Sequence, residues 1–327
     1  MNRASIPLPE VEALRQRLNR LRRHLSQYFV AKDEVVDLMV LCTLVQEPLL
    51  LVGKPGTGKS DLVVKFCQAL GLGDGEYFEY MLTKFTEPGE ILGPVDINLL
   101  KEGRYWRRTA AKLPEARVVF LDEIFKSNSA ILNTLLTVIN ERKFYQDGQP
   151  VAIPMVMLFA AANEIPEFGE LAALVDRFVL KVESEPVRET HFEDLIDKGL
   201  RNEGFRVFNQ RPWVGQASLD DFIALKAHFD RQLLTEERLE AGPVGDGFPE
   251  GEFLLFKRIL NTLAKEDRIS VTDRKVIKLY KLLRAWAFLD HGGGVRRADL
   301  RLLRYIADRL QDFAPVREKV DSLLQLD

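Results

Sequence analysis

The most specific chemical signal in the sequence is a glycine-rich segment that runs from Gly53 to Ser60. An apolar run (48–52) precedes it, and residues of helical character (61–66) follow it, which is the strand–loop–helix context of a phosphate-binding loop. The segment matches the pattern G-x-x-x-x-G-K-[ST], so we predict a nucleoside triphosphate site. Its residues are Gly53, Lys54, Pro55, Gly56, Thr57, Gly58, Lys59 and Ser60.

Each residue type in this loop suits phosphate binding. Glycines let the backbone curl so that successive N–H groups point at phosphate oxygens, and the following helix, from about Asp61, adds the positive end of its dipole. Lys59 can reach the β- and γ-phosphates, and the Ser60 hydroxyl can ligate Mg²⁺. A turn that merely joins a strand to a helix is the alternative interpretation, which the complete match disfavours.

Two adjacent carboxylates end a second apolar run, residues 117–123. This run is typical of a central parallel strand, whose carboxyl end reaches the active-site edge of the sheet. Burying a carboxylate without a partner costs several kcal/mol, so two adjacent carboxylates at a strand end need partners. A metal ion and an attacking water would be such partners. We expect Asp122 to hold Mg²⁺, mostly through water, and Glu123 to polarise the nucleophilic water. The alternative is a strand that simply stops at polar residues.

Two further polar residues follow predicted secondary structure. Asn163 comes just after the apolar run 155–161, where its amide could orient the water or contact the γ-phosphate. Arg177 lies at the end of a short predicted helix (171–178), and its alternative role is a surface arginine paired with Asp176.

Composition limits the class of protein. The chain has 327 residues, enough for roughly two domains, and its apolar and charged contents are typical of a soluble globular protein. The net charge of −3 gives no indication of a nucleic-acid partner. Two cysteines argue against a disulfide framework or a zinc site, and the four isolated histidines lack the spacing of metal ligands. No run approaches the ~20 apolar residues of a membrane span. We therefore expect a cytoplasmic protein whose cysteines are buried in helices.

The predicted helix at residues 9–27 carries an apolar face and several arginines. It is either an amphipathic helix packed on the core, which we favour, or an arm for nucleic acid or a protein partner. After residue 185 strand signals give way to helical periodicity. We expect a nucleotide-binding core at 1–185, a connecting helix (190–200) and linker (201–217) within 186–217, and an all-α domain at 218–327. The helices predicted there span 218–236, 252–264, 272–288, 296–311 and 315–325.

The order of these motifs resembles that of AAA+ ATPases, with an α/β core that contains a parallel sheet between helices, followed by a smaller all-α lid. Residues 78–88, 119–126, 131–142 and 161–166 are similar to the MoxR group, and to its RavA branch in particular. The resemblance covers residues from about 28 to 310. It assigns Walker A to Gly53–Ser60, Walker B to Asp122 and Glu123, sensor 1 to Asn163, the arginine finger to Arg177 and sensor 2 to Arg274.

The same resemblance implies further sites and an assembly. The stretch from Tyr28 to Lys32, which includes Val30 and Ala31, is similar to the segment that cradles the adenine of ATP or ADP. Residues 86–113 would hold a helix-2 insert, and 143–154 a pre-sensor hairpin. An arginine finger that acts in trans requires a ring, so a homo-hexamer is implied. Arg142 is the alternative trans arginine. The nucleotide-binding residues are expected to be Val30, Ala31, Gly53 to Ser60 and Asp61, with Mg²⁺ on Ser60 and Asp122.

By resemblance the protein is an Mg²⁺-dependent ATP hydrolase that remodels or matures a protein complex, as a chaperone, together with a VWA-domain partner and a protein client. RavA-type proteins continue into a further partner-binding domain after the lid, whereas this chain ends at Asp327, so we carry over no partner contacts from that branch. The alternatives are a CbbQ-like activator of a metabolic enzyme, a nucleotide-gated scaffold or timer, and a nucleic-acid motor. The last would use the basic N-terminal helix and residues 104–108, and the overall charge counts against it.

Overall fold

A five-stranded sheet, parallel throughout, forms the centre of the computed structural model, which describes residues 7–73, 75–166, 171–235 and 239–325. The strand order is β2–β3–β6–β1–β7. Because all strands run in one direction, their carboxyl ends share one edge of the sheet. The strands are β1 (Leu49–Val52), β2 (Tyr77–Met81), β3 (Val118–Asp122), β6 (Met157–Ala162) and β7 (Leu180–Glu183).

Helices cover both faces of this sheet, because successive side chains of a strand point to opposite sides. In β1, Leu49 and Leu51 pack with one set of helices, while Leu50 and Val52 pack with the other. This alternation confirms the predicted α/β core. The first set is α1 (Leu8–Ser26), α2 (Asp33–Val45) and α3 (Lys59–Ala69), and the second is α4 (Pro88–Leu92), α6 (Ser129–Glu141) and α7 (Ala172–Val175).

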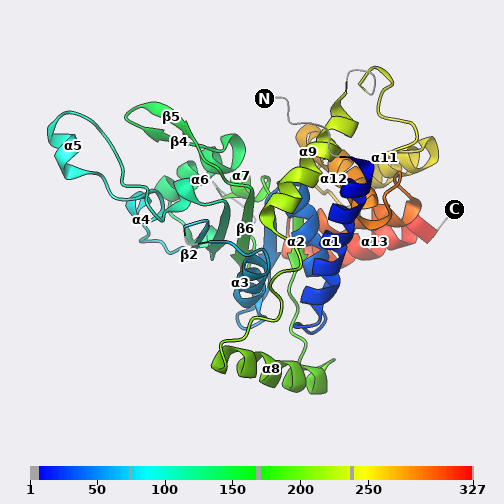
Figure 1. The fold of residues 1–327 in the computed structure, drawn as a ribbon. Coiled ribbons are helices and arrows are strands. Elements are labelled where there is room, and N and C mark those ends of the chain that lie inside the picture. Colours follow the sequence, from blue (N-terminus) through cyan, green and yellow to red (C-terminus); the bar gives the residue numbers. More distant parts are fainter. Residues whose placement is uncertain (1–6, 74, 167–170, 236–238, 326–327) are drawn as a thin grey trace.

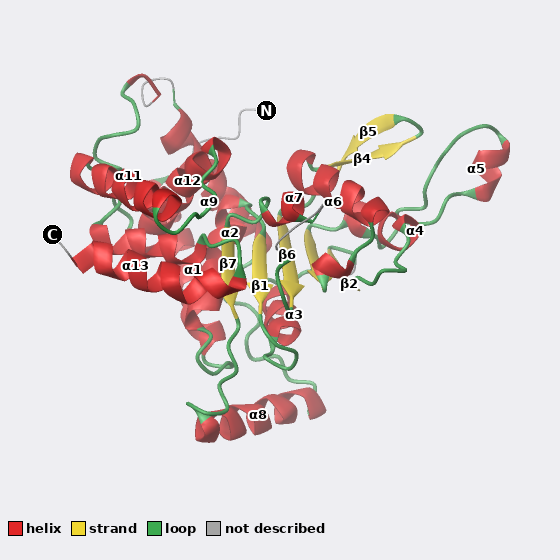
Figure 2. Cartoon of the chain, turned by 180° about the vertical axis from the view of Figure 1, so that it is seen from behind, coloured by secondary structure: helices red, strands yellow, loops and turns green. Residues whose placement is uncertain are grey.

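A helical region follows the sheet and lies to one side of it (Figures 1 and 2). Its apolar residues join the same cluster as α1 and α2, so the region packs directly on the core. The helix predicted over 296–311 is shorter than expected and forms as the 3₁₀-helix η3 (Arg297–Tyr305). Leu300, Leu303 and Ile306 are fully buried at every third residue, which is the 3₁₀ repeat. The α-helices are α9 (Leu219–Leu234), α11 (Glu250–Lys265), α12 (Asp273–His291) and α13 (Phe313–Gln325).

The connecting helix α8 (Phe192–Val207) is longer than predicted and stands apart from the helical region (Figure 1). The chain at 201–207, which the sequence assigned to a linker, continues the helix because no proline interrupts it before Pro212. None of its residues is buried.

The predicted insert and hairpin project on the side away from the helical region (Figure 2). The insert carries α5 (Ile97–Lys101), and the hairpin consists of β4 (Lys143–Gln146) and β5 (Gln149–Ala152). The insert contacts the turn of the hairpin: Tyr105 N donates to Asp147 Oδ1 and Asp147 N donates to Tyr105 O, both over 2.9 Å. These two hydrogen bonds link the insert to the hairpin.

Both cysteines are free thiols buried in helices, as predicted, with Cys42 in α2 and Cys67 in α3. Burial raises the pKa of each thiol. Within the described ranges, no helix combines the length and apolar character needed to cross a bilayer.

Candidate nucleotide site

Three of the sequence signals meet where β1, β3 and β6 end. Val52 pairs with Ala162 in the parallel ladder, and Gly53 N continues it by donating to Ala162 O over 3.1 Å. The phosphate loop therefore begins beside Asn163. On the other side of β6, β3 brings Asp122 to the same edge.

Lys59 is the most enclosed charged group of the loop. It is 8% exposed, and its Nζ donates to Gly53 O (2.5 Å), Lys54 O (3.1 Å) and Asn163 Oδ1 (3.2 Å). Burial lowers the pKa of Lys59, while the carboxylates of Asp122 and Glu123 act in the opposite direction. The ammonium thus folds back onto the loop's own carbonyl oxygens, which a phosphate oxygen can replace.

Asn163 connects this lysine to the acidic pair. Its Nδ2 donates to Glu123 Oε1 over 2.5 Å, while its Oδ1 accepts from Lys59. The backbone of Glu123 is left-handed (φ +54°) and its N–H donates to Asp122 Oδ1 over 2.8 Å. The two carboxylates therefore point to different partners, as their different predicted roles require.

Ser60 and Asp122 offer adjacent oxygen atoms, since Ser60 Oγ donates to Asp122 Oδ2 over 3.0 Å. Among the described residues no group of three or more His, Cys, Asp or Glu side chains could hold a metal ion. Mg²⁺ does not need such a group, because it usually keeps several waters and binds one or two protein oxygens together with substrate phosphates. A hydroxyl beside one carboxylate fits that requirement.

The glycines of the loop make a cradle that side chains would fill. Gly56 and Gly58 have φ values of +82° and +80°, and a Cβ on either would meet no atom within 4 Å, so the space beside them is open. A Cβ on Gly53 would lie 2.5 Å from Ser184 O. The loop therefore exposes backbone where phosphate is expected and packs tightly where β7 ends.

A cleft of about 350 Å³ adjoins the loop. The predicted residues Val30 and Asp61 line it, although the Asp61 carboxylate is paired with Lys65 Nζ at 2.5 Å. Ala31 instead lines the neighbouring groove along α1. The loop residues that line the cleft are Lys54, Pro55, Gly56, Thr57 and Gly58.

Lys32, at the end of the predicted adenine segment, also lines the cleft, together with Lys198 and Asn202, which were not anticipated from the sequence. Lys32 Nζ donates to the backbone oxygen of residue 185 over 2.6 Å, and burial lowers its pKa. Lys198 Nζ and Asn202 Nδ2, from α8, donate to the carbonyls of residues 29 and 28 over 2.5 and 2.8 Å. The one signal in the sequence is that Lys198 and Asn202 are four residues apart, which places them on the same face of a helix.

The three candidate arginines occupy different environments. Arg177 follows α7, and its guanidinium reaches Asp176 Oδ2 at 3.4 Å. Arg274 is exposed in the first turn of α12, and among the residues that the structure describes no hydrogen bond or ion pair joins it to the phosphate loop. Arg142 is turned inward, where it donates to Met155 O (3.1 Å) and Gln46 O (2.8 Å), and burial lowers its pKa. These contacts indicate a structural role for Arg142 within the chain.

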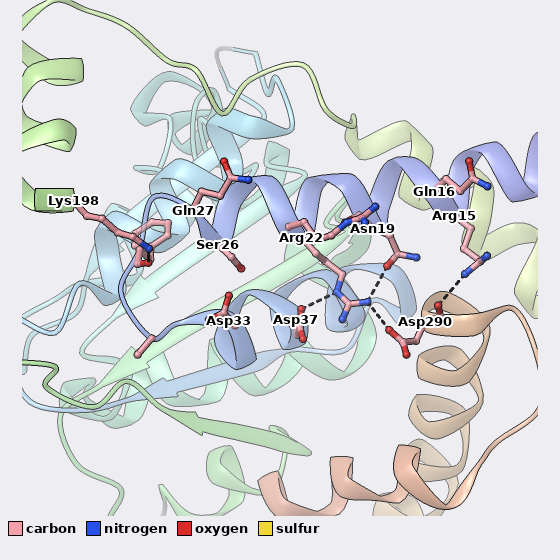
Figure 3. Close-up of a pocket in the computed structure, with 13 residues that line it drawn as sticks. Arg15, Gln16, Asn19, Arg22, Ser26, Gln27, Asp33, Asp37, Lys198 and Asp290 are labelled. Atoms are coloured by element: carbon pink, nitrogen blue, oxygen red, sulfur yellow. Dashed lines mark hydrogen bonds and ion pairs between the residues drawn. The ribbon is translucent and has the colours of Figure 1, made fainter. Parts of the chain in front are cut away.

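The basic face of α1 is largely occupied by contacts within the chain (Figure 3). Arg22 donates to Asp37 Oδ1 (2.8 Å), Asn19 Oδ1 (2.9 Å) and Asp290 Oδ1 (3.2 Å), and Arg15 donates to the carbonyl of Asp290. The apolar face is buried, which agrees with the favoured interpretation of a packed amphipathic helix. Its buried residues are Val11, Leu14, Leu18, Leu21 and Leu25.

Comparisons with known proteins agree with this geometry. Residues 16–224 match the model of the MoxR domain in MoxR–vWA–beta-propeller ternary systems, and residues 254–318 match an AAA lid domain. An uncharacterised protein of Methanocaldococcus jannaschii, MJ0079, is 30% identical over 89% of this chain and 70% of its own. The chaperone MoxR1 of Mycobacterium tuberculosis is 27% identical over 50% of this chain and 43% of its own. The crystal structure of a candidate ATPase from Cytophaga hutchinsonii shares the fold, with a TM-score of 0.70 at 14% identity over 97% of this chain and 96% of that one.

Proposed function

Because the chain belongs to the MoxR family of AAA+ ATPases, we propose that it hydrolyses ATP with Mg²⁺ as a hexameric ring that remodels a protein complex. The observation that carries the proposal is the connected set of Lys59, Asn163 and Glu123 at the carboxyl edge of the sheet. We further propose a core at 1–185, a connector at 186–217 and a lid at 218–327, in a cytoplasmic protein.

In this proposal Glu123 accepts a proton from the attacking water, and Asn163 fixes its carboxylate. Lys59 exchanges its carbonyl partners for phosphate oxygens, and Arg274 and a neighbouring subunit's Arg177 add positive charge where the γ-phosphate becomes more negative. Mg²⁺, held by Ser60 and Asp122, would supply further countercharge to the phosphates.

The family model supports a VWA-domain partner, since its description places such MoxR domains in ternary systems with a vWA protein. The resemblance to a chaperone supports a protein client. The ion-paired face of α1 gives no support to a nucleic-acid motor.

The test of hydrolysis is Glu123→Gln. We expect nucleotide affinity to stay within about two-fold of the wild type, while kcat falls by about 10²- to 10⁴-fold, the usual contribution of a general base. Undiminished turnover in this variant would refute the role of Glu123.

The test of the ring is the oligomeric mass with and without Mg²⁺ and ATP, for the wild type and for Arg177→Ala, with turnover measured on the same samples. We expect a nucleotide-dependent hexamer whose turnover collapses in the variant. Arg142→Met is the matched control, because that arginine is held by its own subunit's carbonyl groups. A fully active monomer in both proteins would refute the ring and leave the nucleotide site standing.

A further inference from the structure

Glu123 has a second partner besides Asn163, and it comes from the turn that follows β3. Lys126 Nζ lies 3.1 Å from Glu123 Oε1, the same oxygen that accepts the hydrogen bond from Asn163. The carboxylate is therefore held at one oxygen by donors from two different elements.

The backbone places the lysine there. Glu123 adopts a left-handed conformation, and Lys126 N donates to Glu123 O over 2.8 Å, which closes the short 3₁₀ turn η2 (Ile124–Lys126). Ile124 is fully buried and anchors that turn in the core. Holding a non-glycine residue in the left-handed region costs about 1 kcal/mol, so this turn persists because its surroundings hold it.

The two side chains differ in exposure. Glu123 is 16% exposed, whereas Lys126 is 56% exposed, so the pair sits at the rim of the site. With Oε1 occupied by both donors, Oε2 is the oxygen that is left to receive the proton from water.

We propose that Lys126 is a positioning residue for Glu123: together with Asn163 it fixes the carboxylate so that Oε2 faces the attacking water. This inference rests on the proposed ATPase function. Lys126 itself would touch neither the nucleotide nor the water.

The experiment compares Lys126→Met, Lys126→Arg and a control, Lys257→Met, which removes an exposed lysine from α11. For Lys126→Met we expect kcat to fall about 1.5- to 5-fold, the range that a partly exposed ion pair supports. KM, the equilibrium affinity for ATP and the thermal midpoint should stay unchanged. The arginine variant should recover the wild-type kcat, and in a Glu123→Gln background the loss of Lys126 should have no further effect.

A second readout needs no turnover. In crystals of the nucleotide-free proteins, the Glu123 carboxylate should stay beside Asn163 in the wild type and lose that single orientation in Lys126→Met. An unchanged carboxylate, an unchanged kcat or an increased kcat would each overturn the proposal, the last by making Lys126 a restraint. A wild-type protein without ATP turnover would instead refute the proposed function, and the crystals would still test the positioning.

Discussion

Replacing Asp308 with asparagine should destabilise the contact between the sheet and the helical region. Asp308 is the shared partner of two buried lysines: Lys181 Nζ in β7 and Lys275 Nζ in α12 each lie 3.0 Å from its Oδ1. These lysines are 1% and 3% exposed. The variant leaves both ammonium groups without a countercharge, although each keeps backbone partners at Phe178 O and Ile306 O.

The magnitude follows from this burial. Removing one member of a buried ion pair costs about 3–5 kcal/mol, because an uncompensated charge stays inside the protein. For a chain of 327 residues that unfolds cooperatively, the unfolding entropy is about 0.7 kcal/mol/K, so the midpoint should fall by about 4–7 °C.

The assay is unfolding by heat, for the midpoint, and by urea, for the free energy. Each is followed by tryptophan fluorescence and far-UV circular dichroism, whose coincidence tests two-state behaviour. Asp312→Asn is the matched control: the same change four residues later breaks a pair with Arg309, which is 41% exposed, and should cost less than about 1 kcal/mol. Equal losses in the two variants would refute the reasoning.

Four further predictions follow from the described contacts. Burial lowers the pKa of Lys181 to about 8, against about 10.4 for a free lysine. Between about pH 8 and about pH 10.4 the unfolded chain therefore binds more protons than the folded chain, so the free energy of unfolding rises with pH in this range. Urea titrations should therefore show that the free energy of unfolding of the wild type, relative to that of Lys181→Met, rises by about 2–3 kcal/mol between pH 7.5 and 10.5. A difference that stays constant with pH would contradict this. Gly53→Ala should abolish nucleotide binding, measured with a fluorescent ATP analogue, because its Cβ would lie 2.5 Å from a backbone oxygen at the end of β7. Arg142→Met should cost about 1–3 kcal/mol in urea by leaving two carbonyls unpaired, while the folded fraction keeps its kcat; a loss as severe as that of Arg177→Ala would refute its structural role. Trp106→Ala, at an exposed position of the insert, should reduce client-stimulated turnover and leave basal turnover unchanged, and full stimulation would exclude the insert from client contact.

The sequence predicted most of the core because local patterns specify it. Apolar runs that end in Gly53, Asp122 or Asn163 are typical of buried strands, and a parallel sheet then brings their carboxyl ends to one edge. Predictions were weaker where the local pattern is ambiguous. The 3₁₀-helix η3 carries apolar residues that also suit an α-helix, and α8 continues through polar residues that equally suit a linker.

The sequence alone thus determined the glycine-rich loop after β1, the acidic pair after β3 and the α/β class, because each depends on residues that are neighbours in the chain. Tertiary structure alone decided which distant residues come together: Lys198 joins the cleft from α8, and Arg142 turns inward to the carbonyl groups of Met155 and Gln46. It also placed Asp308 between two buried lysines from different elements. The physical reason is that such contacts depend on how preformed helices and strands pack, and a single sequence carries no record of which side chains that packing brings together.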